Sequence, residues 1–257
     1  MTETEALDRL LGAKNLRDIC PDTVKRVFER QLKAYKTPAE AEKAARVRLH
    51  ALTGAFMTSK EFKSARACLA RYADGDESAL SDALRLHSST CERMEYAQAL
   101  YERITSLTGT PDSVYDAACG INPLYLGAAG FPRVRGADIN NGAVSLVNDW
   151  AEAAGWDVRA DCADVNVSLP EERWKLALAF KLLPVLETNE KGSALRLMER
   201  LNAEYIAVSF PTRTLSGRGA GMEKHYSEFF ERETDGKFRI LDRFTAGSEL
   251  VYVVSRL

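Results

Sequence analysis

The sequence has little of what membrane-spanning, secreted and metal-binding proteins require. No stretch approaches the ~18 consecutive apolar residues of a membrane span. The first residues are acidic and lack an apolar run, so we expect no signal peptide. The five cysteines are scattered, odd in number and without C-x-x-C spacing, and there are only three histidines. These absences predict reduced thiols, no metal site and a cytoplasmic protein.

Two signatures of nucleotide binding are also missing. The chain contains neither a G-x-G-x-x-G fingerprint nor a Walker A loop. A dinucleotide and a nucleoside triphosphate are therefore poor candidates for a cofactor. With 46% hydrophobic residues among 257, the chain can nevertheless build a large α/β domain and a smaller module.

The most informative segment that is present covers residues 113–124. It predicts a buried strand that ends in Asp116, a turn of small residues through Gly120 and then a helix. A second acid, Asp138, ends the next predicted strand, and Asp164 lies beyond the third. A small-residue turn lets the backbone approach a ligand, and a carboxylate at a strand end accepts both hydroxyls of a ribose. S-adenosylmethionine is the nucleoside cofactor that fits best, and an ordinary strand-turn-helix is the alternative.

Residues 1–110 predict helices. Pro21 and Pro38 mark two helix starts, and Thr58 begins a capping box before a third helix. A longer helix is expected over residues 91–107, where Gly109 and Pro111 end it.

Residues 111–257 alternate strands and helices, which predicts a mostly parallel sheet with right-handed crossovers. The turn between the last two strands is too short for a crossover, so they form an antiparallel hairpin. Five parallel strands and a terminal hairpin make the core of a class I (Rossmann-like) S-adenosylmethionine-dependent methyltransferase. The expected strands are 113–116, 134–138, 157–160, 174–181, 204–210, 238–244 and 249–255. The expected helices are 122–129, 141–154, 189–202 and 221–232.

Charge is distributed unevenly in a chain whose net charge is only −2. Residues 9–71 contain 15 Lys and Arg against six Asp and Glu, whereas residues 72–257 contain 20 against 28. A basic block on a near-neutral protein is the footprint expected for a polyanion partner. A solvated helical bundle is the alternative, and composition does not separate the two.

The segment 180–184 follows the fourth predicted strand, at the edge where open α/β sheets bind ligands. It lacks the Asp/Asn-Pro-Pro-aromatic pattern of exocyclic amine methylation. No cysteine lies there or in the next such loop, as cytosine C5 methylation would need. By elimination the acceptor is a ready nucleophile such as N7 of guanine, and catalysis is placement in line with the methyl group. Lys181 is either functional here or an ordinary surface lysine.

Three arginines also stand out. Arg213 and Arg218 lie in a glycine-rich loop after the fifth strand, which can follow a phosphate backbone or frame a base. A plain flexible loop is the alternative. Arg93 lies one turn into a helix that Ser89 or Thr90 would cap, where the helix dipole does not favour a cation. We expect an anionic partner for Arg93, either the methionine carboxylate of the cofactor or a neighbouring Glu.

Together these segments resemble the aminoglycoside-resistance 16S rRNA methyltransferases that act on N7 of guanine 1405. The resemblance covers nearly the whole chain. The matching stretches are 20–24, 44–50, 87–93, 118–124, 180–184, 209–213 and 221–223. The last three of these stretches in combination are specific for the family, whereas the cofactor turn at 118–124 alone is not.

The resemblance implies roles for individual residues. The predicted catalytic residues are Arg218 and Arg213, which the resemblance places near the target base, and Lys181, which its position at the sheet edge suggests. The implied cofactor contacts are Phe56, His87, Ser88, Ser89, Arg93, Ala118, Gly120, Asp138, Asp164, Phe180 and Asn189, the last at a position where Gln often stands. The implied rRNA contacts are Arg213, Arg218 and Met222 near the target base and Lys14, Arg17, Arg46 and Arg48 on phosphates. His225 falls where family members often have Asn, so no role is carried over.

The resemblance also implies a partner and a phenotype. The partner is the 30S ribosomal subunit, the cofactor is S-adenosylmethionine, and the protein is expected to be a monomer that uses no membrane or metal. Methylation would confer resistance to 4,6-disubstituted 2-deoxystreptamine aminoglycosides. The alternatives are a methyltransferase for adenine N1 or another RNA site, a non-catalytic ribosome-binding protein with the same fold, and a small-molecule methyltransferase.

Overall fold

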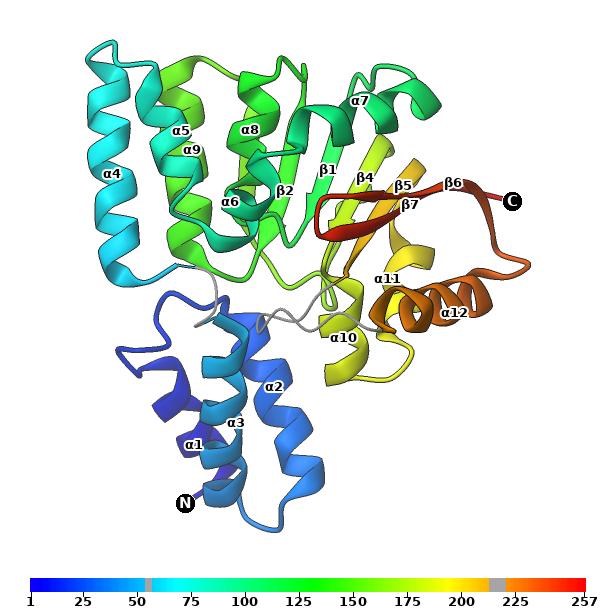
Figure 1. Cartoon of the computed structure of the whole chain (residues 1–257). Coiled ribbons are helices and arrows are strands. Elements are labelled where there is room, and N and C mark those ends of the chain that lie inside the picture. Colours follow the sequence, from blue (N-terminus) through cyan, green and yellow to red (C-terminus); the bar gives the residue numbers. More distant parts are fainter. Residues whose placement is uncertain (54–56, 213–220) are drawn as a thin grey trace.

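The computed structural model describes residues 1–53, 57–212 and 221–257. In these residues the strands form a seven-stranded sheet with helices on both faces, and a helical module at the N-terminus lies below its carboxyl edge (Figure 1). The strands are β1 Val114–Ala117, β2 Val134–Asp138, β3 Val158–Cys162, β4 Trp174–Phe180, β5 Ala203–Pro211, β6 Phe238–Ala246 and β7 Glu249–Arg256. The helices are α1 Glu3–Leu11, α2 Pro21–Ala34, α3 Pro38–Thr53, α4 Ser59–Ala73, α5 Ser78–Leu84, α6 Ser88–Met94, α7 Ala97–Thr108, α8 Asn122–Ala128, α9 Asn141–Ala154, α10 Leu183–Asn189, α11 Ser193–Arg200 and α12 Met222–Thr234.

The strand order is β3-β2-β1-β4-β5-β7-β6. The first five strands of this order are parallel, and β7 pairs antiparallel with both β5 and β6. The predicted parallel sheet with a terminal antiparallel hairpin is therefore confirmed. Strand order reverses between β1 and β4, which is where open α/β sheets leave a crevice for a ligand.

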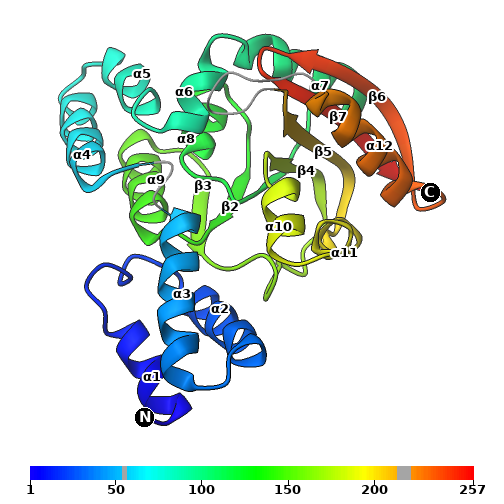
Figure 2. The same ribbon diagram turned by 60° about the horizontal axis from the view of Figure 1, so that its bottom comes forward.

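Alternate residues of the central strands enter two different hydrophobic clusters, as the two-residue period of a strand requires. Val114 packs into the cluster that α4, α5, α7, α8 and α9 cover, whereas Tyr115 packs into the cluster beneath α10, α11 and α12. Figure 2 shows these two groups of helices on opposite faces of the sheet. Both faces of the central strands are thus buried, as the near-continuous apolar sequence of β4 predicts.

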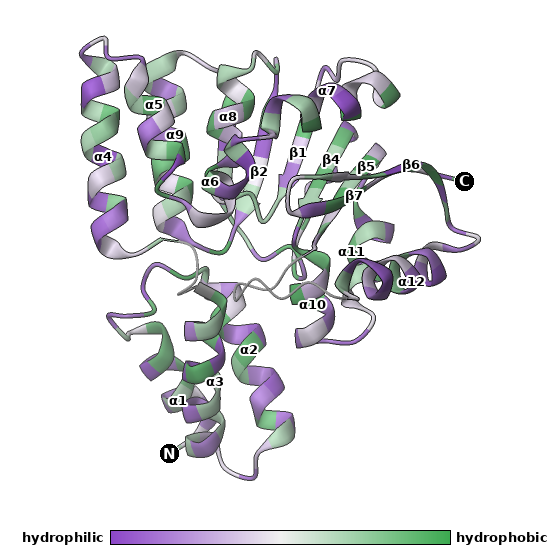
Figure 3. Ribbon diagram, viewed as in Figure 1, coloured by the Kyte–Doolittle hydropathy of each residue, from purple (hydrophilic) through white to green (hydrophobic). Residues whose placement is uncertain are grey.

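The helices α1–α3 form a module with its own core. Leu10, Phe28 and Leu49 are buried in a cluster to which only residues of this module contribute among those described. Its helices alternate hydrophilic and hydrophobic residues along their length (Figure 3). In contrast, α4–α7 belong to the helical layer on one face of the sheet, where α4 packs on α9 and α5 packs on α8. Helices α1–α3 and helices α4–α7 therefore pack in two separate hydrophobic clusters. The domain boundary after residue 110 stays a prediction.

The helix predicted over residues 91–107 is wrong, because α6 and α7 are separate helices. Tyr96 lies between these two helices. Its ring packs so closely on Gly247 of the β6–β7 turn that a Cβ added to Gly247 would lie 2.0 Å from the ring. The predicted caps Ser89 and Thr90 are also wrong. His87 caps α6, since its Nδ1 accepts a hydrogen bond from the backbone N–H of Thr90.

The helix predicted over residues 189–202 begins too early, because its counterpart α11 starts at Ser193, and the preceding helix α10 was not predicted. Gly192 separates them in a left-handed conformation, with φ of +77°. Pro184 lies in the first turn of α10, where proline is a signal for the start of a helix. We assigned residues 180–184 only to the ligand-binding edge of the sheet and did not use this signal. None of the described helices is long and apolar enough to cross a membrane.

Candidate functional site

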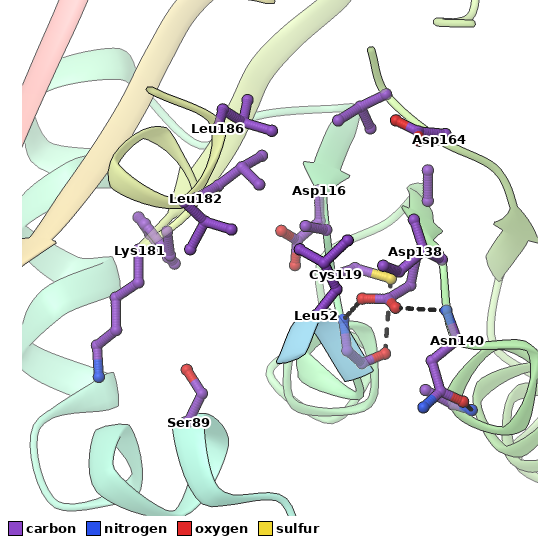
Figure 4. A pocket seen from close by; sticks show the side chains of 18 of the residues that line it. Leu52, Ser89, Asp116, Cys119, Asp138, Asn140, Asp164, Lys181, Leu182 and Leu186 are labelled. Carbon is purple, nitrogen blue, oxygen red and sulfur yellow. Dashed lines mark hydrogen bonds between the residues drawn. The ribbon is translucent and has the colours of Figure 1, made fainter. Parts of the chain in front are cut away.

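A cavity of about 320 Å³ lies at the carboxyl edge of the sheet, over the ends of β1, β2 and β4. Helices α6 and α10 form part of its wall, and Leu52 and Arg26 of the N-terminal module contribute to it. Figure 4 shows side chains from these elements turned toward one space, with Asp116 and Asp138 on adjacent strand ends. Its volume is typical of a small-ligand site.

Asp138 forms the part of the cavity suited to a ribose. Its two carboxylate oxygens accept hydrogen bonds of 2.8 Å from the backbone N–H groups of Gly120 and Asn140. These bonds fix the carboxylate, and each oxygen keeps a lone pair for a ligand hydroxyl. Burial raises the pKa of Asp138 above its ordinary value, although the two backbone N–H groups oppose that rise.

The turn after β1 brings the backbone close to the ligand space. Ala118 and Gly120 have φ of +56° and +51°, in the left-handed region. A Cβ on Gly120 would lie 2.7 Å from the ring of His87, so glycine is required by conformation and by contact. Burial, with Arg93 nearby, lowers the pKa of His87 to about 4, so the imidazole is neutral near pH 7.

Asp116 is an acid of the cavity to which we had given no ligand role. It is buried, and Asn122 donates a 2.6 Å hydrogen bond to it while accepting one from Tyr101. Burial raises the pKa of Asp116 to about 7, against the opposing effects of Asn122 and Arg93. A carboxyl poised in this way favours a cationic group nearby, since a cation lowers its pKa.

Asp164 links the N-terminal module to the cavity. Thr23 and Arg26, both on α2, donate hydrogen bonds of 2.9 and 2.8 Å to the same carboxylate oxygen. The other oxygen accepts from the backbone N–H of Asn166. Asp164 lines the cavity as expected, but its carboxylate is committed to holding α2 against the sheet.

Arg93 has an anionic partner, as predicted, but the reason given for it is wrong: Arg93 lies in the last turn of α6, where the helix dipole favours a cation. Its Nε and one terminal nitrogen donate to Glu249 at 3.1 and 2.9 Å, and both side chains are buried. Tyr96 and Ser209 also donate to Glu249. Burial alone would raise the pKa of Glu249, but Arg93 and Lys181 hold it below its ordinary value.

Lys181 lies at the cavity with φ of +54°, unusual for a residue with a side chain. Its backbone N–H donates to the carbonyl and the hydroxyl of Ser209, at 3.0 and 3.1 Å. Its ammonium group pairs with Glu92 at 2.5 Å and lies 3.6 Å from Glu249. Lys181 is therefore held at the cavity by two carboxylates, and its role in the reaction stays a prediction.

The structure brings most of the other predicted cofactor residues together. Ser89, Phe180 and Asn189 line the cavity, and the guanidinium of Arg93 stacks 4.7 Å from the Phe180 ring. Ser88 is exposed in the first turn of α6. Phe56, Arg213 and Arg218 lie outside the described residues.

The predicted rRNA residues have different surroundings. Lys14, Arg17 and Arg48 are exposed on the N-terminal module. Arg46 is instead held by Glu42 at 2.8 Å and by the carbonyl of Arg9, so it stabilises the module itself. Met222 begins α12 and is half-buried. His225 is exposed, with its ring 5.3 Å from that of Tyr226.

Three functional candidates were missed in the sequence. Glu249 is isolated in an apolar strand, a pattern that signals a buried charge but does not identify its partner. Asp116 was identified only as the end of a strand. Arg26 was counted in the basic block, and nothing local distinguishes it from Arg30, the other arginine of α2.

Comparisons with known proteins agree with this geometry. Residues 13–253 match the family described as ribosomal RNA methyltransferase (FmrO). A 16S rRNA (guanine(1405)-N(7))-methyltransferase from Serratia marcescens is 41% identical over 256 residues, which cover 100% of this chain and 99% of that protein. A protein of the same name from Frankia casuarinae is 32% identical, with coverage of 99% and 92%. The crystal structure of 16S rRNA methyltransferase RmtF in complex with S-adenosyl-L-homocysteine matches with a TM-score of 0.90 at 50% identity, covering 99% of this chain and 98% of that one.

Proposed function

The chain belongs to the ribosomal RNA methyltransferase (FmrO) family, and from this premise we propose that it methylates N7 of guanine 1405 in 16S rRNA. The observation that carries the proposal is the cavity at the sheet edge, where Asp138 and the left-handed turn at Gly120 fit a nucleoside cofactor. The full-length likeness to enzymes named for this reaction supplies the acceptor.

The residues of the cavity fit S-adenosylmethionine, which supplies a methyl group activated by a cationic sulfur when it is bound. Asp138 would accept the ribose hydroxyls, and the Ala118–Gly120 turn would lie against the nucleoside. Arg93 has five N–H donors, of which two are used on Glu249, so others remain for the methionine carboxylate. Asp116 would lie beside the cationic part of the cofactor.

The acceptor needs orientation rather than deprotonation. N7 of guanine carries a lone pair at neutral pH, and it shares an edge of the base with O6. We assign Lys181 and Met222 to this edge, together with Arg213 and Arg218, which lie outside the described residues. Holding the base in line with the methyl group is a proximity effect, so no general base is required.

The N-terminal module would dock on the 30S subunit. Lys14, Arg17 and Arg48 are exposed cations on one small module, which suits contacts with phosphates of folded RNA. Arg46 contributes indirectly, because it braces the module through Glu42. We infer a monomer that acts in the cytoplasm, where its ribosomal substrate is found.

Methylation would change the drug-binding surface of the ribosome. A methyl group on N7 adds bulk and positive charge and removes a hydrogen-bond acceptor. A cationic 4,6-disubstituted 2-deoxystreptamine drug that contacts this edge would lose affinity by repulsion and by the lost hydrogen bond. The expected phenotype is resistance to gentamicin- and kanamycin-type aminoglycosides.

The test is incubation of the full-length protein with purified 30S subunits and methyl-labelled S-adenosylmethionine, followed by borohydride and aniline cleavage. We expect cleavage at guanine 1405. Label without cleavage there would move the target to another atom, such as adenine N1, or to another nucleotide. Bound cofactor without any label in 30S subunits would refute the proposed activity and favour a binding-only role or a small-molecule substrate.

A variant separates placement of the base from binding of the cofactor. Arg218→Ala should abolish methyl transfer and leave the cofactor affinity, measured by calorimetry, unchanged. Equal loss of both would show that Arg218 supports the cofactor or the fold instead.

A further inference from the structure

A second cavity, of about 480 Å³, lies between the N-terminal module and α10. One face of α2 provides Arg26 and Arg30, four residues apart and so on the same side of the helix. Arg48 of α3 faces them, and Tyr35 at the end of α2 is 46% exposed. The remaining lining residues are Val27, Gln31, Ala34, Leu52, Thr188 and Asn189.

The charges around this second cavity favour an anion. No carboxylate is among its described lining residues. Asp164 neutralises Arg26, but no acidic group of the described chain pairs with Arg30 or Arg48. Like charges held around one cavity repel, and an anion between them would relieve that repulsion. The planar donor fork of arginine matches a phosphate particularly well.

The other lining groups point to a nucleotide rather than a bare phosphate. An exposed tyrosine ring can stack on a base, and Gln31, Thr188 and Asn189 carry donors and acceptors suited to a base edge. The volume lies within the range of small-ligand sites, about 300–1,000 Å³.

The position of the cavity separates it from the target base. It meets the cofactor cavity at Arg26, Leu52 and Asn189, and it includes neither Arg93 nor Lys181. We propose that it binds one unstacked nucleotide of 16S rRNA other than the methylated guanine, with the phosphate on Arg30 and Arg48 and the base on Tyr35. This inference rests on the proposed function only for the identity of the RNA.

The first test measures the affinity of full-length variants for purified 30S subunits in the presence of S-adenosylhomocysteine. Arg30→Ala should weaken binding about tenfold, the value of a charge-assisted contact, and lower the salt dependence. Tyr35→Ala should weaken binding about fivefold or more without that salt effect, whereas Tyr35→Phe keeps the stacking ring and should retain affinity.

The matched control is Lys33→Ala, which removes one positive charge from the same helix outside the cavity. If Arg30→Ala lost no more affinity for 30S subunits than Lys33→Ala, the effect would be one of overall positive charge rather than of the cavity, and the proposal would be overturned. Retained affinity of Tyr35→Ala would also overturn it. The side chains of Arg30, Lys33 and Tyr35 are exposed, so the fold should tolerate each replacement.

The second test identifies the occupant. A photoreactive benzoylphenylalanine at position 35 is irradiated in the 30S complex, and crosslinks are mapped by primer extension on 16S rRNA. A single stop away from guanine 1405 is expected. A crosslink to a ribosomal protein, or to guanine 1405 itself, would overturn the assignment. Neither binding nor crosslinking requires methyl transfer, so failure of the proposed activity and failure of this inference are distinguishable.

Discussion

Replacement of Glu249 by Gln tests whether one buried carboxylate stabilises the positions of Arg93 and Lys181 at the cavity. The Glu249 side chain has no exposed surface, and that of Arg93 is 5% exposed, with 2.9 Å between their charged atoms. Gln keeps the shape of the side chain and removes its charge. Arg93 would then be a buried cation with no full counter-charge, and Lys181 would lose a carboxylate 3.6 Å away.

Breaking a buried ion pair by removing one partner costs about 3–5 kcal/mol, because the remaining charge stays desolvated. We therefore expect the free energy of unfolding of Glu249→Gln, from urea titration at pH 7.5, to fall by about that amount. Glu249 has a lowered pKa, so its contribution is present above the ordinary carboxylate pKa and is lost as the pH falls through its folded-state pKa. Wild type and variant should accordingly converge in acid.

Glu172→Gln is the matched control, because it makes the same chemical change in an exposed pair. Glu172 lies 2.8 Å from Arg133, and their side chains are 58% and 40% exposed. Exposed pairs contribute about 0–1 kcal/mol. If Glu249→Gln lost no more stability than Glu172→Gln, or if its loss did not diminish in acid, the argument that Glu249 supports Arg93 would be refuted.

Three further predictions concern the cofactor cavity. Gly120→Ala adds a Cβ 2.7 Å from the His87 ring at a left-handed position, so calorimetry should show at least about a tenfold loss of cofactor affinity; an unchanged affinity would contradict the close approach. Asp138→Ala should weaken cofactor binding by a similar factor, and retained affinity in calorimetry would exclude Asp138 as the ribose acceptor. The pKa of buried His87 is lowered to about 4, so as the pH falls the unfolded chain protonates this imidazole before the folded protein does. The free energy of unfolding from urea titrations should therefore fall by up to about 3 kcal/mol between pH 6.5 and pH 4. His87→Gln should remove this part of the pH dependence.

Much of the fold could be predicted because its signals are local. Strands that alternate with helices indicate a parallel sheet, and a short turn after β6 requires an antiparallel partner. The expected strand 134–138 coincides with β2. The helix predicted over 91–107 failed for a non-local reason. Nothing near Tyr96 breaks a helix in the sequence, but its ring must fit against Gly247 of a distant turn.

The candidate site divides in the same way. Asp138 and Gly120 lie on consecutive strand-turn units, so spacing alone identifies them as neighbours. Glu249 is 156 residues from Arg93, and the two meet only because β7 inserts between β5 and β6. The anionic partner of Arg93 was expected, although the helix-dipole argument for it fails in the last turn of α6, and only the sheet order identifies Glu249 as that partner.

Among residues 1–53, 57–212 and 221–257, the two non-glycine residues in left-handed conformation are Ala118 and Lys181, and both line the cofactor cavity. A left-handed residue with a side chain costs about 1–3 kcal/mol and persists only where surrounding contacts determine it. At Lys181 those contacts are the two hydrogen bonds to Ser209 and the ion pair with Glu92. Ser209 in turn donates to Glu249, so the strained backbone of Lys181 and the buried cation of Arg93 depend on one carboxylate. Backbone strain at two residues of one cavity, supported at Lys181 by a buried charge that also holds Arg93, is the arrangement expected where geometry rather than acid–base chemistry determines the rate.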